Sequence, residues 1–320
     1  MNELSKISKI IKQSKTFFIA GHIKPDGDSL GAAFALSKML SRLGKKAQVY
    51  CLDEIPKELL CIKGIKSIKQ QKPVGRIFDC AIILESLNLQ RMGDIISPQQ
   101  AKKIINIDHH KSYSNFGDVN YVDGNSSSVS ELVLNLFNYL KLKPTKDEAS
   151  NLYVGLLTDT RKFQNSNVSS KSHLAAAQLI DCGASASTIT RQIYSNKTFQ
   201  SLKLLAMALL GLKTFADGKV AYVIITQKML KDCGAKSDDS NGIANYLLKV
   251  SNVQVACMIK EDGENTRLSM RSVKEFNLLP IAQKFGGGGH KNAAGATVKK
   301  TIPQVEKLLK TYFKSSTRNR

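Results

Sequence analysis

Short apolar runs alternate with amphipathic segments along the first part of the chain. Apolar runs predict buried strands at 16–20, 48–52, 80–84 and 103–107. After the first run, apolar residues recur at helical spacing from Leu30 to Leu43 and stop at Gly44. The same spacing predicts helices over 129–140, 147–157 and 172–180. Strands that alternate with helices predict a parallel α/β sheet, with helices on both of its faces.

The pattern weakens near Gly183 and differs beyond it. Residues 185–213 have helical periodicity and predict a connector. Strand-like runs and helix-like segments then follow without regular alternation, at 219–226, 253–260 and 267–271 and at 242–248, 278–285 and 303–313. We therefore predict an α/β domain with a parallel sheet over 1–184, a helical linker over 185–213, and a smaller α+β domain over 214–320.

Length and composition are those of a folded protein, but the charge is unusual. The 320 residues suffice for two domains, and 42% hydrophobic with 23% charged residues excludes disordered and fibrous chains. There are 47 Lys and Arg against 26 Asp and Glu, a net charge of +21. This excess favours an anionic partner such as nucleic acid. A generally lysine-rich composition is the simpler explanation, and charge alone does not decide between the two.

The cysteines and the apolar runs predict the cellular compartment. The six cysteines lack the paired spacing of zinc sites, which is typical of buried thiols under reducing conditions. No apolar run approaches the roughly 18 residues of a membrane span, and residues 1–15 lack the apolar core of a signal peptide. We expect a cytoplasmic protein with no membrane partner.

Side chains of the kinds that bind metals follow three of the predicted strands. They are His22, Asp26 and Asp28 after 16–20, Glu85 after 80–84, and Asp108, His109 and His110 after 103–107. Asp159, where a helical pattern ends, is a further candidate. The carboxyl ends of parallel strands share one edge of a sheet, so these groups are expected to converge. Mixed imidazole and carboxylate ligands suit manganese, zinc or iron, and paired ions of this kind are common in phosphoester cleavage.

Each of these pieces also has a simpler explanation. Asp26 and Asp28 are compatible with a turn followed by a helix cap. One of the adjacent histidines is compatible with a buried position and the other with a solvated one, and Glu85 with a surface carboxylate. Their joint occurrence at one sheet edge favours a metal site.

Several motifs resemble the DHH phosphoesterase superfamily. The segment 22–31, HIKPDGDSLG, and the triplet Asp108, His109, His110 resemble its first and third motifs. Residues 158–160, Thr-Asp-Thr, resemble the fourth. Arg271 and Ser272, followed by GGGGHKNAAG at 286–295, resemble the DHH-associated C-terminal domain. The two-domain layout is most similar to that of the bifunctional oligoribonucleases and pAp phosphatases, the nanoRNases.

This resemblance implies a dinuclear centre and a substrate class. By the resemblance, His22 and Asp26 bind one Mn²⁺, Asp28, His109 and Asp159 bind the other, and the carboxylate of the second motif bridges them. His110 then faces the scissile phosphate, and Asp108 orients the neighbouring histidines. Mg²⁺, Zn²⁺ or Co²⁺ are alternatives to Mn²⁺. The implied substrates are short RNA oligonucleotides and pAp or related nucleotides, and the implied assembly is a homodimer.

The second domain is expected to bind the substrate. The candidate phosphate-binding residues are Arg271, Ser272, Gly286, Gly287, Gly288, Gly289 and His290. Glycines let main-chain N–H groups approach phosphate oxygens closely, and the fork of an arginine fits phosphate. A flexible hinge is the alternative explanation for the glycines.

The sequence departs from the family pattern at three positions. Glu85 stands where the family has a bridging Asp, Asn88 where a second acidic residue is common, and Arg161 where Gly is usual. Arg161 is expected either to bind substrate phosphate or to repel a metal. The departures leave open a retuned hydrolase, a cyclic-dinucleotide or pApA phosphodiesterase on the same site, and a non-catalytic nucleotide-binding protein.

Overall fold

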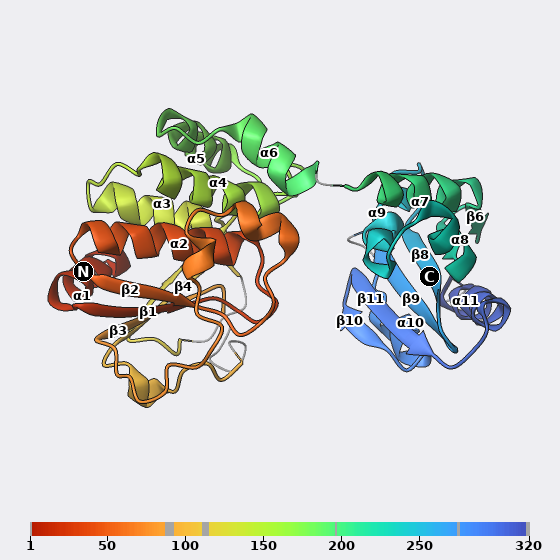
Figure 1. Ribbon diagram of the computed structural model, residues 1–320, viewed down its shortest axis with the longest axis horizontal. Helices are drawn as coiled ribbons and strands as arrows, with labels where there is room; N and C mark the ends of the chain where they lie inside the picture. Colours follow the sequence, from red (N-terminus) through yellow and green to blue (C-terminus); the bar gives the residue numbers. More distant parts are fainter. Residues whose placement is uncertain (1, 87–92, 111–114, 196, 274–275, 318–320) are drawn as a thin grey trace. The chain divides into compact units, whose positions relative to one another are not determined.

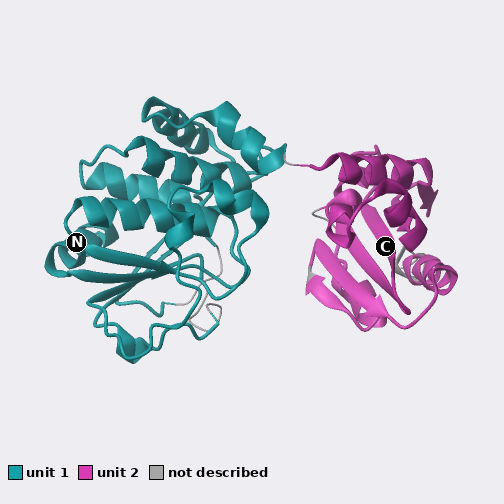
Figure 2. Ribbon diagram, viewed as in Figure 1, with its two compact units in different colours: residues 1–196 teal, residues 197–320 magenta. Residues whose placement is uncertain are grey.

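The computed structural model describes residues 2–86, 93–110, 115–195, 197–273 and 276–317. The chain divides into two compact units, Met1–Asn196 and Lys197–Arg320 (Figure 2). Among the described residues, no helix has both the length and the apolar character needed to cross a membrane.

The first unit contains a five-stranded parallel sheet (Figure 1). Its strands are β1 (Thr16–Ala20), β2 (Lys46–Tyr50), β3 (Cys80–Leu84), β4 (Ile104–Asp108) and β5 (Val119–Val122), in the order β2-β1-β3-β4-β5. The prediction of a parallel sheet from buried apolar strands is confirmed. The edge strand β5 was missed because its sequence, VNYV, is short and only its first residue is fully buried.

The helices of this unit cover one face of the sheet. They are α1 (Glu3–Gln13), α2 (Gly27–Arg42), α3 (Val129–Tyr139), α4 (Lys146–Asp159), α5 (Ser170–Asp181) and α6 (Ala186–Tyr194). All six contribute to one apolar core, which also contains Phe17 and Ile19 of β1. The opposite face, with Phe18 and Tyr50, packs against loop residues such as Ile95.

The expectation of helices on both faces is therefore wrong for the described residues. On the second face, the connection before β4 carries the 3-10 turn Pro98–Gln100 instead of an α-helix. The 3-10 turns Lys57–Cys61 and Ile65–Ser67 bury Leu59 and Ile65 in the core on the helix side. Loops bury the strands as completely as helices would, since every residue of β3 is buried. The apolar pattern of a strand reports that a face is covered, and it does not report by what.

The second unit has a six-stranded mixed sheet. Its strands are β6 (Lys213–Phe215), β7 (Val220–Ile225), β8 (Val255–Asp262), β9 (Asn265–Ser272), β10 (Gly288–His290) and β11 (Ala293–Val298), in the order β10-β11-β9-β8-β7-β6. Only β7 and β8 pair in parallel. The helices are α7 (Phe199–Leu210), α8 (Gln227–Cys233), α9 (Ile243–Leu247), α10 (Leu279–Lys284) and α11 (Ile302–Thr317). The α+β class is confirmed.

The predicted connector is divided between the two units. Ile189 and Ile193 of α6 are buried in the core of the first unit. Leu204 and Ala208 of α7 are buried against the sheet of the second. The boundary falls at Asn196, between the helices, because each helix buries its apolar side in the nearer core. The segment 185–213 therefore does not form a separate linker, because its two helices belong to different units.

Candidate active site

The ends of β1, β3 and β4 bring imidazoles and carboxylates together. These strands are neighbours, and Ala20 pairs with Ile83 while Leu84 pairs with Ile107. The next residues along each strand therefore meet at the carboxyl edge. His109 Nε2 lies 3.2 Å from one oxygen of Glu85, and His22 Nε2 lies 4.0 Å from the other. Glu85 thus stands between the two histidines.

The donor atoms form three overlapping groups, each spanning less than 4.8 Å. The groups are His22, Asp26 and Glu85; Asp28, His109 and Asp159; and Glu85, His109 and His110. Within them, His22 Nε2 lies 3.5 Å from Asp26 Oδ2, and His109 Nε2 lies 3.8 Å from Asp159 Oδ2. All six candidate metal ligands lie in these groups, and we call these six residues, without His110, the rim cluster.

The start of α2 places the two aspartates of the first motif. Asp26 is the N-cap, and its Oδ1 accepts from the N–H groups of Asp28 and Ser29. The simpler explanation, a helix cap, thus applies to Asp26 in addition to its place in the rim cluster. Asp28 is fully buried, and its oxygens accept from the N–H groups of Val129 (2.6 Å) and Ser130 (2.9 Å) at the start of α3.

Two glycines let α2 and α4 approach closely enough to hold this arrangement. A Cβ at Gly31 would lie 2.3 Å from the Asn151 carbonyl oxygen. A Cβ at Gly155 would lie 2.5 Å from Asp28 Oδ1. Such contacts exclude any side chain, so the helix packing that positions Asp28 and Asp159 depends on both glycines.

Burial and mutual repulsion disfavour the charged forms of Glu85, Asp28 and Asp159, whereas the hydrogen bond with His22 contributes to a lowered pKa for Asp26. Burial, together with the neighbouring Asp26, raises the pKa of Glu85 well above its ordinary value. Burial and the nearby Asp159 do the same to the pKa of Asp28. Among the described residues, no lysine or arginine pairs with the rim cluster. Glu85 Oε2 is buried and has no hydrogen-bond partner in the described part of the chain. A set of carboxylates that lacks cationic partners suits bound divalent cations.

Asp108 and His110 form a separate pair next to the rim cluster. Asp108 is fully buried, and its Oδ1 accepts from the backbone N–H of His110 at 3.0 Å and lies 2.7 Å from His110 Nδ1. Burial alone would raise the pKa of Asp108. The hydrogen bonds from His110 outweigh burial, so the pKa of Asp108 lies below its ordinary value. A charged Asp108 fixes the orientation of the His110 ring and assigns its proton to Nδ1.

Asn167 supports Asp159 and was not found from the sequence. Its Nδ2 donates to Asp159 Oδ2 at 3.2 Å and to the Ser127 carbonyl at 2.9 Å. The Asn165 side chain donates to the Asp159 carbonyl at 2.8 Å. The run QNSN at 164–167, directly after the fourth motif, is the signal that could have indicated this support.

Arg161 has a backbone conformation in the left-handed region that favours glycine. Its φ is +47°, and Lys162 and Phe163 follow with φ of +61° and +62°. This region is costly for residues with a Cβ and free for glycine. Arg161 is exposed on the turn after α4, two residues beyond Asp159. Its backbone N–H donates to the Thr158 carbonyl at 3.1 Å.

The glycine loop of the second unit forms strand β10 at the sheet edge. The pairing places positions 271, 293 and 290 in one row across β9, β11 and β10. The backbones of Arg271 and His290 are therefore separated by a single strand. The side chain of His290 lies outside the described part of the chain, as do Asn88 and the neighbouring positions 87–92.

The four glycines at 286–289 differ in why the fold requires a glycine at each position. Gly286 has φ of +68°. A Cβ at Gly287 would lie 2.1 Å from the Gly295 carbonyl oxygen, and one at Gly289 would lie 2.5 Å from the Ala293 carbonyl oxygen. A Cβ at Gly288 would have no neighbour within 4 Å. The fold itself thus requires Gly286, Gly287 and Gly289, whereas nothing in the fold accounts for Gly288.

Ser272 is engaged within the second unit. Its hydroxyl donates to the Phe276 carbonyl at 2.8 Å and accepts from Asn292 Nδ2 at 2.9 Å. Asn292 also donates to the carbonyls of Val273 and Phe276. Arg271 Nη1 donates to the Met270 carbonyl at 2.8 Å. These bonds tie the glycine loop to the end of β9, so Ser272 and Asn292 have a structural role whatever else they contact.

Comparison with known proteins agrees with this architecture. The DHH family N-terminal domain matches residues 16–156, and the DHHA1 domain matches residues 217–315. The bifunctional oligoribonuclease and PAP phosphatase NrnA of Thermus thermophilus is 29% identical over 284 residues, which cover 88% of this chain and 84% of that protein.

Solved structures show the same fold. An exopolyphosphatase-related protein from Bacteroides fragilis has a TM-score of 0.87 at 25% identity, covering 98% of this chain and 96% of that one. The exonuclease RecJ bound to manganese has a TM-score of 0.53 at 13% identity, covering 98% of this chain and 94% of that one. The chain thus consists of a DHH family N-terminal domain followed by a DHHA1 domain.

Proposed function

We propose that this chain is a metal-dependent phosphoesterase that hydrolyses short oligoribonucleotides to 5′-mononucleotides and converts pAp to AMP. The observation that carries the proposal is the rim cluster, in which six imidazole and carboxylate groups gather at one edge of the sheet. The relative from Thermus thermophilus is named for both activities.

The rim cluster fits two divalent cations. In the proposal, His22 and Asp26 would hold one cation, Asp28, His109 and Asp159 would hold the other, and Glu85 would serve both. Glu85 Oε2, which has no hydrogen-bond partner among the described residues, and the raised pKa of Asp28 support this assignment. When bound, such cations offset the charge of the phosphate and lower the pKa of a nearby water. We favour Mn²⁺, since a structure with the same fold was solved with manganese.

In the proposed reaction, His110 would transfer a proton and Asp108 would hold the His110 ring in position. The hydrogen bond to Asp108 holds the proton of His110 on Nδ1, so Nε2 is the ring nitrogen assigned to the substrate. A neighbouring carboxylate also raises the basicity of the ring, which suits it to take a proton from one oxygen and return it to the leaving oxygen. Asp108 is accordingly a positioning residue, and His110 is the catalytic residue.

The second unit would bind the remainder of the substrate. Arg271 provides a guanidinium and lies in the same row of strand positions as His290. At Gly288, the absence of a side chain leaves space for a phosphate oxygen to approach the main chain. We assign substrate binding to Arg271, Gly288 and the backbone of the glycine loop. Arg161, exposed near Asp159, is the corresponding candidate in the first unit.

The proposed function requires that Glu85 can replace the shorter aspartate expected at this position from the resemblance. Its two oxygens lie near two different histidines, as a bridging ligand requires. Its φ of +51° shows that the backbone at the end of β3 adopts an unusual conformation to place it there. We therefore expect the longer side chain to be accommodated.

The test uses the full chain with Mn²⁺ and labelled di- to decaribonucleotides, pAp, pApA and a cyclic dinucleotide. We expect release of 5′-mononucleotides from the shortest RNAs and of AMP from pAp. Glu85→Gln should nearly abolish turnover, because the amide lacks the charge for a bridge, whereas Glu85→Asp should retain part of it. Cleavage confined to pApA or to a cyclic dinucleotide would favour the alternative phosphodiesterase. Binding without any cleavage would overturn the proposal in favour of a nucleotide-binding protein.

A further inference from the structure

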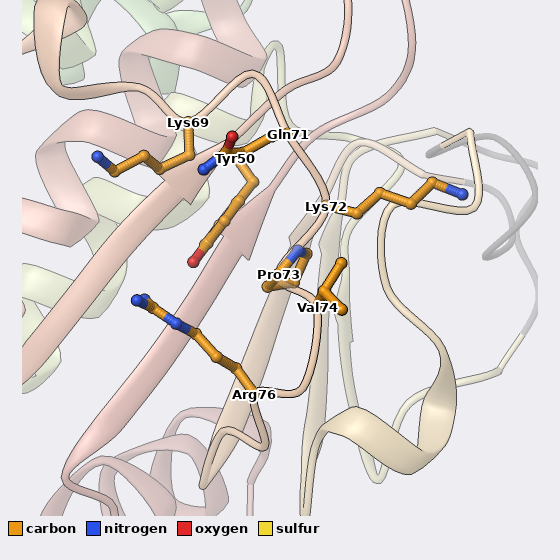
Figure 3. Close-up of a pocket in the computed structure, with 7 residues that line it drawn as sticks. All are labelled: Tyr50, Lys69, Gln71, Lys72, Pro73, Val74 and Arg76. Atoms are coloured by element: carbon orange, nitrogen blue, oxygen red, sulfur yellow. The ribbon is translucent and has the colours of Figure 1, made fainter.

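A basic hollow in the first unit lies apart from the rim cluster (Figure 3). It has a volume of about 360 Å³. Its lining residues are Tyr50, Lys69, Gln71, Lys72, Pro73, Val74 and Arg76. Tyr50 ends β2, and the other residues belong to the loop that crosses the helix-free face of the sheet toward β3. We call this hollow the Tyr50 pocket.

The charge of the Tyr50 pocket exceeds the general basicity of the chain. Three of its seven lining residues are cations and none is acidic, whereas the whole chain has 47 basic residues in 320, about one in seven. Two other hollows of the described structure each include an aspartate, Asp94 or Asp239. Within the described ranges, Lys69, Lys72 and Arg76 pair with no carboxylate. No described carboxylate therefore compensates their charge.

The pocket is preformed by contacts that hold both of its walls. Tyr50 is 3% exposed, and its ring stacks on Phe18 with centroids 4.7 Å apart. The loop is anchored at one end by a β-bridge between Tyr50 and Lys69. At the other end, Gln100 Nε2 donates to the Pro73 carbonyl at 2.9 Å. A site held in this way needs little ordering when a ligand binds.

The polar groups converge on one side of the loop. In Figure 3 the Tyr50 hydroxyl and the Arg76 guanidinium point toward one another, and the Lys69 ammonium points to the same side. Lys72 points to the opposite side. Pro73 and Val74 add an apolar wall, and Val74 is 87% exposed. A planar guanidinium, an ammonium and a hydroxyl beside an apolar wall match the chemistry of a nucleotide, with phosphate at one end and an apolar body at the other.

We propose that the Tyr50 pocket binds a phosphate-bearing ligand, with the phosphate held by Lys69, Arg76 and the Tyr50 hydroxyl. Two sources of the phosphate are consistent with its position. Tyr50 pairs with Ala20, two residues before His22, and the Lys24 N–H bonds to Asp53 just beyond β2. The phosphate belongs either to a distal part of an RNA strand held at the rim cluster or to a separate nucleotide. The RNA source rests on the proposed function, whereas the nucleotide source does not.

The RNA source is tested by kinetics as a function of substrate length. The variant is Lys69→Ala with Arg76→Ala, and the control is Lys6→Ala with Lys9→Ala, which removes the same charge from exposed positions of α1. For a pentaribonucleotide with Mn²⁺, we expect the pocket variant to raise KM about tenfold and to weaken its salt dependence. The KM for a dinucleotide and kcat should be unchanged. The control should match the unmodified chain.

The nucleotide source is tested by AMP binding to the metal-free full chain, measured by calorimetry. We expect the pocket variant to weaken AMP binding at least tenfold while the control binds as the unmodified chain does. This readout requires no turnover, so it remains informative if the protein cleaves no RNA. All replaced residues are exposed, and unchanged melting temperatures verify folding. If neither the length dependence nor AMP binding changes, or if the control changes equally, the proposal is overturned.

Discussion

At the carboxyl edge of the five-stranded sheet, imidazoles and carboxylates approach within 4.8 Å of one another, whereas the β10 edge of the six-stranded sheet presents mainly glycine main chain. The first edge belongs to a parallel sheet, in which several strands end side by side. The second belongs to an antiparallel pair, whose strands pass each other closely. The two units thus use side chains in one case and backbone in the other.

The difference determines which substitutions each region tolerates. In the rim cluster, metal binding depends on the chemical identity of each side chain, and the strand ends are spaced widely enough to hold several ligand side chains. In the glycine loop, an added methyl group matters because the strands leave no space for it at Gly287 or Gly289. Removing a side chain should therefore abolish chemistry in the first unit, and adding one should disturb the second.

The largest expected effect is that of His109→Ala. His109 takes part in two of the three donor groups, so its loss should lower kcat about 1,000-fold or more and reduce the number of bound metal ions. Turnover of a dinucleotide and metal content by elemental analysis measure these effects. The matched control is His173→Ala, whose ring stacks on Phe163 outside the rim cluster, and it should retain activity. Near-normal turnover by His109→Ala would remove the metal site from the proposed function.

The next effect separates two neighbouring glycines. Gly287→Ala should destabilise the second unit by about 1–3 kcal/mol, because its Cβ would lie 2.1 Å from the Gly295 carbonyl oxygen. Gly288→Ala should leave the melting temperature unchanged, since its Cβ meets nothing within 4 Å.

In the proposed function, Gly288→Ala should instead raise KM for short RNA several-fold, because the methyl group occupies the approach of a phosphate oxygen. Scanning calorimetry and steady-state kinetics on both variants check this pair of outcomes. Equal destabilisation by the two variants would show that the loop is packed uniformly and that the distinction between these glycines is wrong.

The rim cluster should also make stability depend on pH and metal in a way that the glycine loop cannot. Burial raises the pKa of Glu85, Asp28 and Asp159, so these three groups hold their protons to higher pH in the folded chain than in the unfolded chain. The contribution of these three groups to the stability of the metal-free protein should therefore fall as pH rises from about 4 through the raised pKa values.

Divalent cations compensate this repulsion, so the rise in melting temperature on adding Mn²⁺ should be larger at about pH 8 than at about pH 5.5. Melting curves with and without Mn²⁺ at both pH values test this, and His109→Ala should show a smaller gain. A metal effect that is independent of pH would contradict the assignment.

The smallest expected effect is that of replacing Arg161, a residue with a side chain in a backbone conformation that favours glycine. Arg161 has φ of +47°, so Arg161→Gly should stabilise the first unit by about 1 kcal/mol. If Arg161 binds substrate phosphate, the same variant should raise KM. Calorimetry and kinetics separate the two contributions, and a loss of stability would show that the arginine side chain makes packing contacts that outweigh the backbone strain.

The rim cluster could be predicted because each ligand follows a strand that the sequence identifies. The residues 16–20 and 80–84 are apolar throughout, and His22 and Glu85 lie just beyond them. The supports of the cluster could not be predicted in this way. Asn167 lies in a loop, and Gly155 lies inside α4, so neither has a local pattern that relates it to Asp159 or Asp28.

The sequence alone therefore determined the order of the strands and helices, the basic charge and the set of candidate ligands, because periodicity and residue type are local properties. The tertiary structure decided which face of the sheet has helices, which of the four glycines the fold requires, and that Tyr50 faces Arg76 across a loop. These features depend on contacts between distant segments, and the free energy of such contacts is set by packing in three dimensions.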